Sequence, residues 1–188
     1  CRDCIKGIKN FENPDKRTKR LKVFLEKISN QDADASIAIG YPSIEYSATT
    51  SGQVTDLKMN TSKEDIFLSW IGGALGITVG GAVSILFINK RILLDIYKGW
   101  KFYRKALNDT LMLDGNKINS WNGQWLSHYY DQREYVEEKP FANFAPYKVD
   151  KDGIMGIVTQ TWTKILISIS KRYINAQILG YIYSIDKT

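Results

Sequence analysis

The two cysteines of the chain, Cys1 and Cys4, have the spacing of a metal-ligand pair. A structural zinc site needs four ligands, which usually come from two such pairs or from one pair and two histidines. The chain contains one histidine, His128. Cys1 and Cys4 are therefore at most half of a zinc site that upstream residues or a partner chain would complete. The sequence predicts neither a bound metal nor a cofactor.

His128 stands beside Tyr129 and Tyr130, in an aromatic part of the chain. A histidine that acts as a general base normally works with a serine or cysteine nucleophile and a third group that orients it. No such set accompanies His128, and no glycine-rich phosphate loop is present. We therefore expect that the protein is not an enzyme.

Two tryptophans, Trp121 and Trp125, enclose the dipeptide Asn122-Gly123, which is typical of a tight turn. Two interpretations stay open for this segment. The rings could stack on a partner or on a nucleic-acid base. They could equally pack in the core of a β-hairpin.

A run of 24 residues, from Ile66 to Asn89, contains no charged side chain. As a helix with a rise of about 1.5 Å per residue, it would cross the roughly 30 Å of a bilayer's hydrocarbon core. Small residues recur at every fourth position, so that another transmembrane helix could approach closely on that face. These helix-packing residues are Gly72, Gly76, Gly80 and Ser84.

The same run also fits a helix followed by a strand in a soluble domain. In that interpretation Ser62 caps a helix over Lys63–Leu75, and the chain breaks at Gly80-Gly81. Residues 82–88 then form a core strand, and Asn89 caps the next helix. We favour the membrane span, because a soluble segment of this length normally carries a charge on its solvent side.

The basic excess of the chain is localised. The chain has 26 basic and 20 acidic residues, a net charge of +6, and residues 90–105 hold six basic residues against one acidic residue. Basic clusters beside a span commonly contact lipid headgroups, whereas a nucleic-acid surface is more often spread over the fold. The residues predicted to lie at the membrane interface are Trp70, Lys90, Arg91, Tyr97, Trp100 and Lys101.

Apolar periodicity suggests the other elements. It predicts amphipathic helices over residues 15–29 and 90–108. Residues 30–60, between the first helix and the uncharged run, would be an extended linker with at most one short strand near residues 36–39. Residues 109–148 are rich in turn signals. Alternation predicts two or three antiparallel strands after residue 149, including residues 164–170 and 175–185.

The predicted fold class is therefore α+β, with one transmembrane helix followed by a helix and a small antiparallel sheet. Residues 1–60 would form a basic helix and an extended linker. Residues 61–108 would form the transmembrane helix and its juxtamembrane amphipathic continuation. Residues 109–188 would form a small α+β domain.

Two short segments carry a family resemblance, FYRKALN at residues 102–108 and DGIMGIV at residues 152–158. With them, residues 66–188 resemble the mitochondrial inner-membrane family of the presequence-translocase regulatory subunit and cytochrome oxidase assembly factor one. In that family a Tyr-x-x-Ala-Leu helix follows the span, and a Gly-x-x-Gly strand motif comes later. The resemblance implies a binding domain without catalysis, with respiratory-chain or translocase partners.

We expect a non-catalytic, single-span accessory or assembly subunit of a membrane complex of the mitochondrial inner membrane. Its partners would be other transmembrane helices and lipid headgroups. The alternative is a soluble, basic nucleic-acid-binding subunit of a larger assembly. In that alternative Cys1 and Cys4 form half a zinc site, and Trp121 and Trp125 stack on bases. The start at Cys1 rather than Met suggests a processed form or a fragment.

Overall fold

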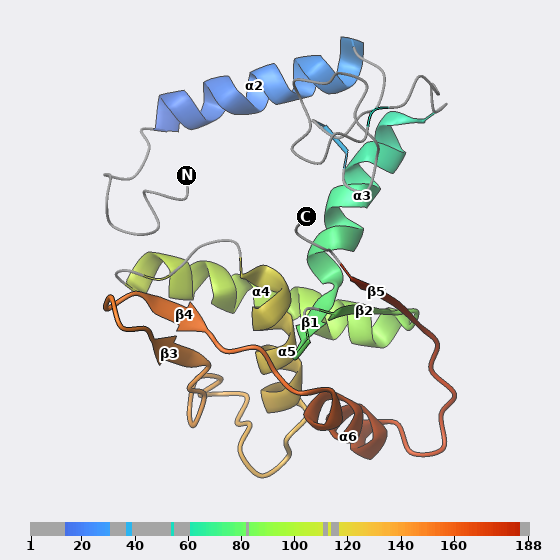
Figure 1. The fold of residues 1–188 in the computed structure, drawn as a ribbon, viewed down its shortest axis with the longest axis vertical. Coiled ribbons are helices and arrows are strands. Elements are labelled where there is room, and N and C mark those ends of the chain that lie inside the picture. Colours follow the sequence, from blue (N-terminus) through green and yellow to red (C-terminus); the bar gives the residue numbers. More distant parts are fainter. Residues whose placement is uncertain are drawn as a thin grey trace. The chain divides into compact units, whose positions relative to one another are not determined.

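The computed structural model describes residues 14–30, 37–38, 54, 61–81, 83–110, 113 and 117–184. Figure 1 shows the five helices and five strands of these residues. They belong to two compact units. The N-terminal unit holds the described residues between Glu12 and Ala74, and the C-terminal unit holds those between Leu75 and Lys187. Cys1, Cys4 and most of the predicted linker lie outside the described residues.

The N-terminal unit contains helix α2, Pro14–Asn30, and nearly all of helix α3, Lys63–Leu75. The predicted helix over residues 15–29 is thus confirmed. Trp70 of α3 donates its indole N–H to the carbonyl of Ile37 at 2.7 Å and lies edge-on to Phe24. The buried residues of this unit are Ile28, Ile37, Ala38 and Ile66.

Helix α3 begins with a reciprocal cap. The hydroxyl of Ser62 accepts from the Asp65 amide at 3.2 Å, and the Asp65 carboxylate accepts from the Ser62 amide at 3.1 Å. This arrangement satisfies two backbone donors that a helix start leaves without intrahelical partners. The helix is 13 residues long and ends just before Gly76.

The predicted membrane span is wrong. Across the parts of the chain that the structure describes, no helix has the combination of length and apolar character that crossing a bilayer requires. After α3 the uncharged run forms strands β1, Ile77–Val79, and β2, Val83–Phe87. β-Branched residues favour the extended backbone of the strands, and Gly81 in the connecting turn has a φ of 94°, which glycine adopts without strain. The helix–strand interpretation is therefore the one that forms.

The row of small residues is dispersed by this break. Gly72 lies in α3, Gly76 joins α3 to β1, Gly80 lies in the turn and Ser84 lies in β2. They share no helical face, so the predicted helix-packing row does not form. Gly76 instead anchors α5, Ile118–Tyr129, because its carbonyl accepts two side-chain amides at 2.8 Å, from Asn119 and Asn122.

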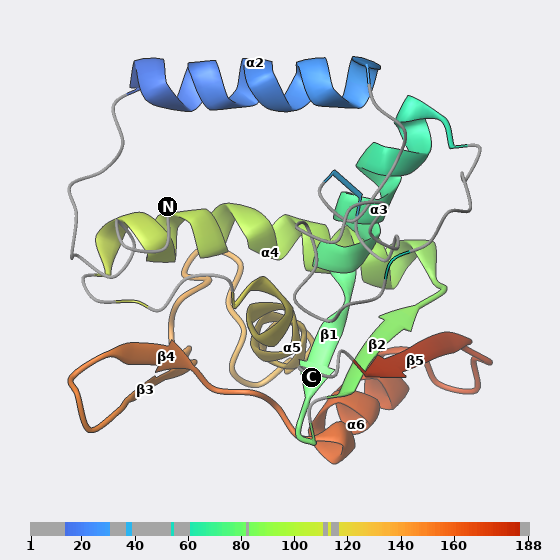
Figure 2. The same ribbon diagram turned by 45° about the horizontal axis from the view of Figure 1, so that its top comes forward.

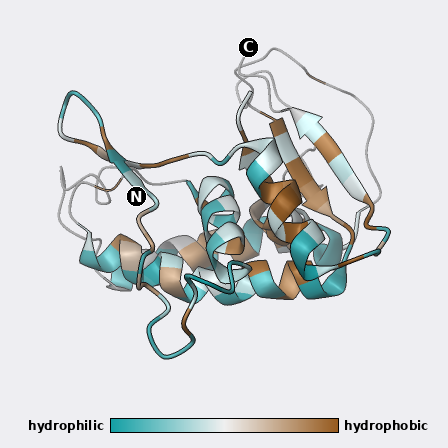
Figure 3. Ribbon diagram, turned by 90° about the horizontal axis from the view of Figure 1, so that it is seen from below, coloured by the Kyte–Doolittle hydropathy of each residue, from teal (hydrophilic) through white to brown (hydrophobic). Residues whose placement is uncertain are grey.

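The C-terminal unit contains two small antiparallel sheets. The larger has the order β1-β2-β5, where β5 is Gly180–Ser184 and Ile85 pairs with both Ile77 and Ile182. The smaller pairs β3, Tyr147–Val149, with β4, Met155–Ile157. In Figure 3 the brown of apolar residues runs along the inner part of the larger sheet, whereas its outer strand is mostly pale. The main core joins this sheet to the helices through Ile77, Val79, Ile85, Phe87, Ile92, Ile96, Leu126, Ile165 and Ile169.

Three helices complete the unit: α4, Lys90–Asp109, then α5, and α6, Trp162–Arg172. Figure 2 shows α5 end-on beneath α4, and α5 contacts α4, β1 and α6. The predicted helix over residues 90–108 is confirmed. Two other predictions are wrong. Residues 109–148, predicted to be rich in turns, contain α5, and residues 164–170, predicted to be a strand, belong to α6.

A close contact joins α4 to α5. The ring of Trp125 lies against the backbone of Gly99, where a Cβ atom would overlap the indole. The indole N–H of Trp121 donates to the Gly99 carbonyl at 3.0 Å, and that of Trp125 donates to the Asp95 carbonyl at 2.9 Å. Both tryptophans are buried in a helix, so neither the hairpin turn nor base stacking by these rings is correct.

Candidate functional site

The outer face of α4 presents a row of cations to solvent. The carboxamide oxygen of Asn89 caps the helix by accepting from the Arg91 and Ile92 amides at 3.0 and 3.2 Å. The inner face buries Ile92, Ile96 and Ala106 in the two cores, so the charged positions between them turn outward. We call the exposed cations the basic row; they are Lys90, Arg91, Lys98, Lys101, Arg104 and Lys105.

Most of this positive charge is not neutralised within the fold. Lys98 forms an ion pair with Asp95, with its Nζ 3.1 Å from Oδ1. This hydrogen bond raises the pKa of Lys98. The other five cations of the basic row have no ion pair with a described carboxylate. The residues of α4 that carry the row thus hold a net charge of +5 over positions 90–105.

Aromatic side chains lie among these cations. Tyr97 is 59% exposed, and its ring lies 5.2 Å from that of Trp100 in an edge contact. Trp100 is half-buried and donates its indole N–H to the Asn122 carboxamide at 3.1 Å. An exposed tyrosine in contact with a tethered tryptophan, among cations, is typical of surfaces that bind anionic ligands with planar rings.

A cavity of about 600 Å³ opens between α4 and the end of α6. Its cations are Arg91, Lys98 and Arg172. We call it the tyrosine cavity because three tyrosines, Tyr97, Tyr129 and Tyr173, also line it. Arg91, Tyr97 and Lys98 belong to α4, so the cavity continues directly from the basic row.

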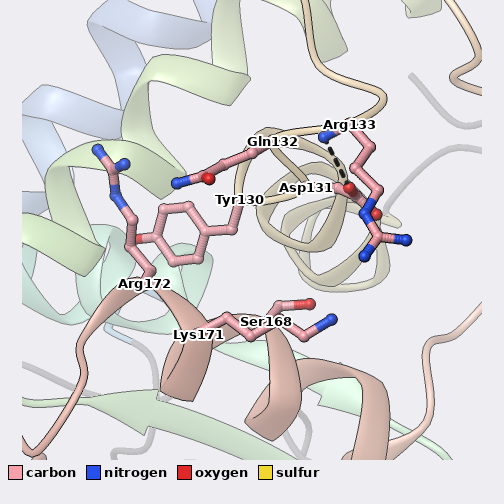
Figure 4. A pocket seen from close by; sticks show the side chains of 7 residues that line it. All are labelled: Tyr130, Asp131, Gln132, Arg133, Ser168, Lys171 and Arg172. Carbon is pink, nitrogen blue, oxygen red and sulfur yellow. Dashed lines mark hydrogen bonds between the residues drawn. The ribbon is translucent and has the colours of Figure 1, made fainter.

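A second cavity of about 330 Å³ lies beside it and shares Arg172. We call it the arginine cavity; its other cations are Arg133 and Lys171. Figure 4 shows the ring of Tyr130 between Arg172 on one side and Asp131 and Arg133 on the other. These three cations have no ion pair with a described carboxylate, and Asp131 accepts from the Arg133 amide at 3.1 Å.

A hydrogen-bond network links the linings of the two cavities. The buried Asp95 accepts from the Tyr130 hydroxyl at 3.0 Å, and that hydroxyl lies 3.3 Å from the hydroxyl of Tyr173. Burial raises the pKa of Tyr130 well above its usual range, so the phenol stays protonated and donates. This network fixes the three side chains and satisfies their buried polar groups.

The structure brings together only some of the residues singled out by the sequence. Five predicted interface residues, Lys90, Arg91, Tyr97, Trp100 and Lys101, share α4, whereas Trp70 belongs to the N-terminal unit. The described residues hold no group of three or more acidic, histidine or cysteine side chains suited to a metal. The sequence reasoning missed the cations of the arginine cavity. Two consecutive basic residues in the last turn of a helix are a common helix-end signal, and this signal could have pointed to Lys171 and Arg172.

His128 is a buried packing residue of the C-terminal unit. Its ring stacks on Phe144 at 4.8 Å, and Nε2 lies 3.1 Å from the carbonyl oxygen of Pro140. Burial lowers the pKa of His128 from its ordinary value of 6.5. The unfolded chain therefore binds this proton more tightly than the folded chain does.

We expect the C-terminal unit to lose stability as the pH falls. The contribution of His128 is complete above about pH 6.5 and is lost as the pH drops through the lowered pKa of the folded state. Urea unfolding at pH 7 and pH 5.5 measures this loss. His128→Gln is expected to show a smaller loss over the same interval, and an equal loss in both proteins would contradict the assignment.

In comparisons with protein-family models, curated proteins and solved structures, no match to this chain was found. The resemblance to the presequence-translocase and oxidase-assembly family therefore stays a prediction.

Proposed function

We propose that the C-terminal unit is a non-catalytic nucleic-acid-binding module of a larger assembly. The observation that carries this proposal is the basic row, six exposed cations on one face of a single helix, of which only Lys98 has an ion pair with a described carboxylate. Exposed cations that the fold does not neutralise attract polyanions and release the counterions of the phosphate backbone when they bind.

The dimensions of the basic row suit a nucleic-acid strand. From Lys90 to Lys105 the row extends about 22 Å at a rise of about 1.5 Å per residue. Tyr97 and Trp100 in its middle would offer a ring surface to an unpaired base, while cations on both sides would contact phosphates. This combination favours a single strand, whose bases are accessible, over a duplex.

The titratable groups near the site support a binding function without catalysis. Asp95 accepts from both Lys98 and Tyr130, and Tyr130 is held by burial in its protonated form. His128 is buried and stacks on the ring of Phe144. Each of these groups is occupied in the fold, so ligand contacts fall to the exposed rings and to the cations without an ion pair. Among those cations, Lys101 and Lys105 also lie over the rings of Phe102 and Phe141.

Exposed apolar side chains around β5 support membership of a larger assembly. Among the described residues no strand pairs with the outer edge of β5. Exposed apolar side chains on and near a sheet edge without a described partner strand are typical of a protein interface. The exposed residues are Ile174, Leu179, Tyr181 and Ile182, each more than 60% accessible. An accessory role in a mitochondrial inner-membrane complex stays a prediction. In such a role, the same apolar surface around β5 would contact a partner subunit.

Neutralising part of the basic row is expected to weaken binding of a 20-nucleotide single strand. The triple variant Lys101→Gln, Arg104→Gln, Lys105→Gln should bind roughly tenfold more weakly, at about 0.5 kcal/mol per exposed charge contact. The slope of log affinity against log salt should fall by about one for each cation removed. Fluorescence anisotropy at several salt concentrations measures both quantities.

The matched control removes three exposed lysines outside the row, through Lys139→Gln, Lys148→Gln and Lys151→Gln. Equal losses in the two triple variants would mean that only net charge matters and would contradict the proposal. Binding to anionic lipid vesicles without binding to the strand would assign the row to lipid headgroups instead.

A further inference from the structure

The arginine cavity is a concentrated cationic site beside the path of the proposed strand. Three cations and one carboxylate line it, so that its lining carries a net charge of +2. The carboxylate of Asp131 is already engaged by the Arg133 amide. The three cations come from two elements, the turn after α5 and the end of α6, and Figure 4 shows the Arg172 and Arg133 guanidinium groups on opposite sides of the Tyr130 ring.

The helix dipole explains only part of this arrangement. Lys171 and Arg172 occupy the last turn of α6, where cations offset the partial negative charge of a helix C-terminus. Arg133 comes from a different element, the turn that follows the C-terminus of α5. The guanidinium of Arg172 also lies 5.9 Å from the ring centroid of Tyr130, which fixes one cation at the entrance shared with the tyrosine cavity.

A phosphate monoester matches this charge better than a phosphodiester. A monoester carries close to two negative charges at neutral pH and offers three acceptor oxygens, whereas each internal phosphate of a strand carries one negative charge. A planar guanidinium group can donate two parallel hydrogen bonds to two of these oxygens. The cavity volume of about 330 Å³ is also at the small end of ligand pockets.

We propose that the arginine cavity binds the terminal phosphate of the nucleic-acid strand whose backbone lies on α4, an inference that rests on the proposed function. The strand passes from the basic row through the tyrosine cavity, where Arg91 and Lys98 lie, to Arg172. There it ends, with its terminal phosphate between Arg133 and Lys171. The module thereby distinguishes a phosphorylated strand end from a hydroxyl end.

The test compares single strands of one sequence that end in a 5′-phosphate, a 3′-phosphate or only hydroxyl groups. Anisotropy titration of the full chain is expected to show roughly tenfold tighter binding of one phosphorylated form, as charge-assisted hydrogen bonds to the terminal phosphate predict. In the double variant Arg133→Gln, Lys171→Gln this ratio should fall to about one. The control Lys148→Gln, Lys151→Gln should keep the ratio, and circular dichroism should show that all variants are folded.

The outcomes separate this inference from the proposed function. Equal affinity for all three strands in the parent chain overturns the terminal-phosphate site and leaves binding by the basic row in place. A ratio that survives in the double variant also overturns it. Adenosine monophosphate that binds as tightly as the phosphorylated strand would assign the cavity to a free nucleotide and overturn it too. Failure of every strand to bind overturns both proposals.

Discussion

Trp125→Ala is expected to lower the free energy of unfolding of the C-terminal unit by about 3–5 kcal/mol, the range typical of truncating a buried tryptophan. The ring is 1% exposed and stacks between Phe102 and Tyr129, with centroid distances of 4.7 and 5.5 Å. Its indole N–H also donates to the Asp95 carbonyl. The truncation therefore leaves a cavity where α4, α5 and the turn after α5 meet.

Urea unfolding followed by circular dichroism measures this loss. Tyr97→Ala is the control, because it removes an aromatic ring from the same helix pair at a position that is 59% exposed. Its effect should stay within about 0.5 kcal/mol. A loss below about 1 kcal/mol for Trp125→Ala would contradict a central role for the contact between α4 and α5.

Gly99→Ala is expected to destabilise the C-terminal unit by about 1–3 kcal/mol, although alanine is the better helix former. A Cβ at this position would overlap the indole ring of Trp125, which is itself held by neighbours on both faces. The ring cannot withdraw without disturbing the core. The steric cost therefore exceeds the gain in helix propensity of roughly 1 kcal/mol.

Gly72→Ala provides a matched substitution with the opposite expected sign. Gly72 lies inside α3, and a Cβ there would have no atom within 4 Å. The substitution should stabilise the N-terminal unit by about 0.5–1 kcal/mol through helix propensity alone. Thermal unfolding of both variants, with each transition assigned to its unit, measures the contrast. If Gly99→Ala stabilised the C-terminal unit, the close packing of Trp125 against α4 would not require a glycine at position 99.

The uncharged run shows why one prediction from sequence failed and its alternative succeeded. Hydropathy averaged over about 19 residues does not register where a helix stops. Local signals do indicate where the helix begins and ends. Ser62 and Asp65 cap its start, and Gly76 and the Gly80-Gly81 pair interrupt the uncharged run. Three elements that are each too short to cross a bilayer, α3, β1 and β2, together gave the average hydropathy of one long helix.

Helix α6 was misread because its apolar spacing fits two periods. Ile165, Ile167 and Ile169 alternate as in a strand, but Ile165 and Ile169 are also four residues apart, as on one helical face. The structure buries those two and leaves Ile167 47% exposed. In α5 the Asn122-Gly123 pair gave a turn signal, whereas tertiary contacts stabilise a helix there. The Asn122 amide donates to the Gly76 carbonyl, far away in sequence.

The candidate site was predictable only along α4. A regular helix places the basic row on its outer face by periodicity alone, so the charges at 90–105 could be found from the sequence. The arginine cavity joins Arg133 to Lys171 and Arg172 across more than 35 positions. That meeting depends on how α6 packs against α5, which no local pattern specifies.

The helix α4 has one face that is fixed by the fold and another that is free to vary. Gly99 and the carbonyls of Asp95 and Gly99 tie its inner side to Trp121 and Trp125. Apart from Trp100, which donates to Asn122 of α5, the outer side carries exposed charges and the Tyr97 ring, which contribute little to packing. Mutations on the outer side can therefore accumulate without loss of the folded state. Related modules could diverge in ligand preference through these positions alone, with the scaffold inherited unchanged.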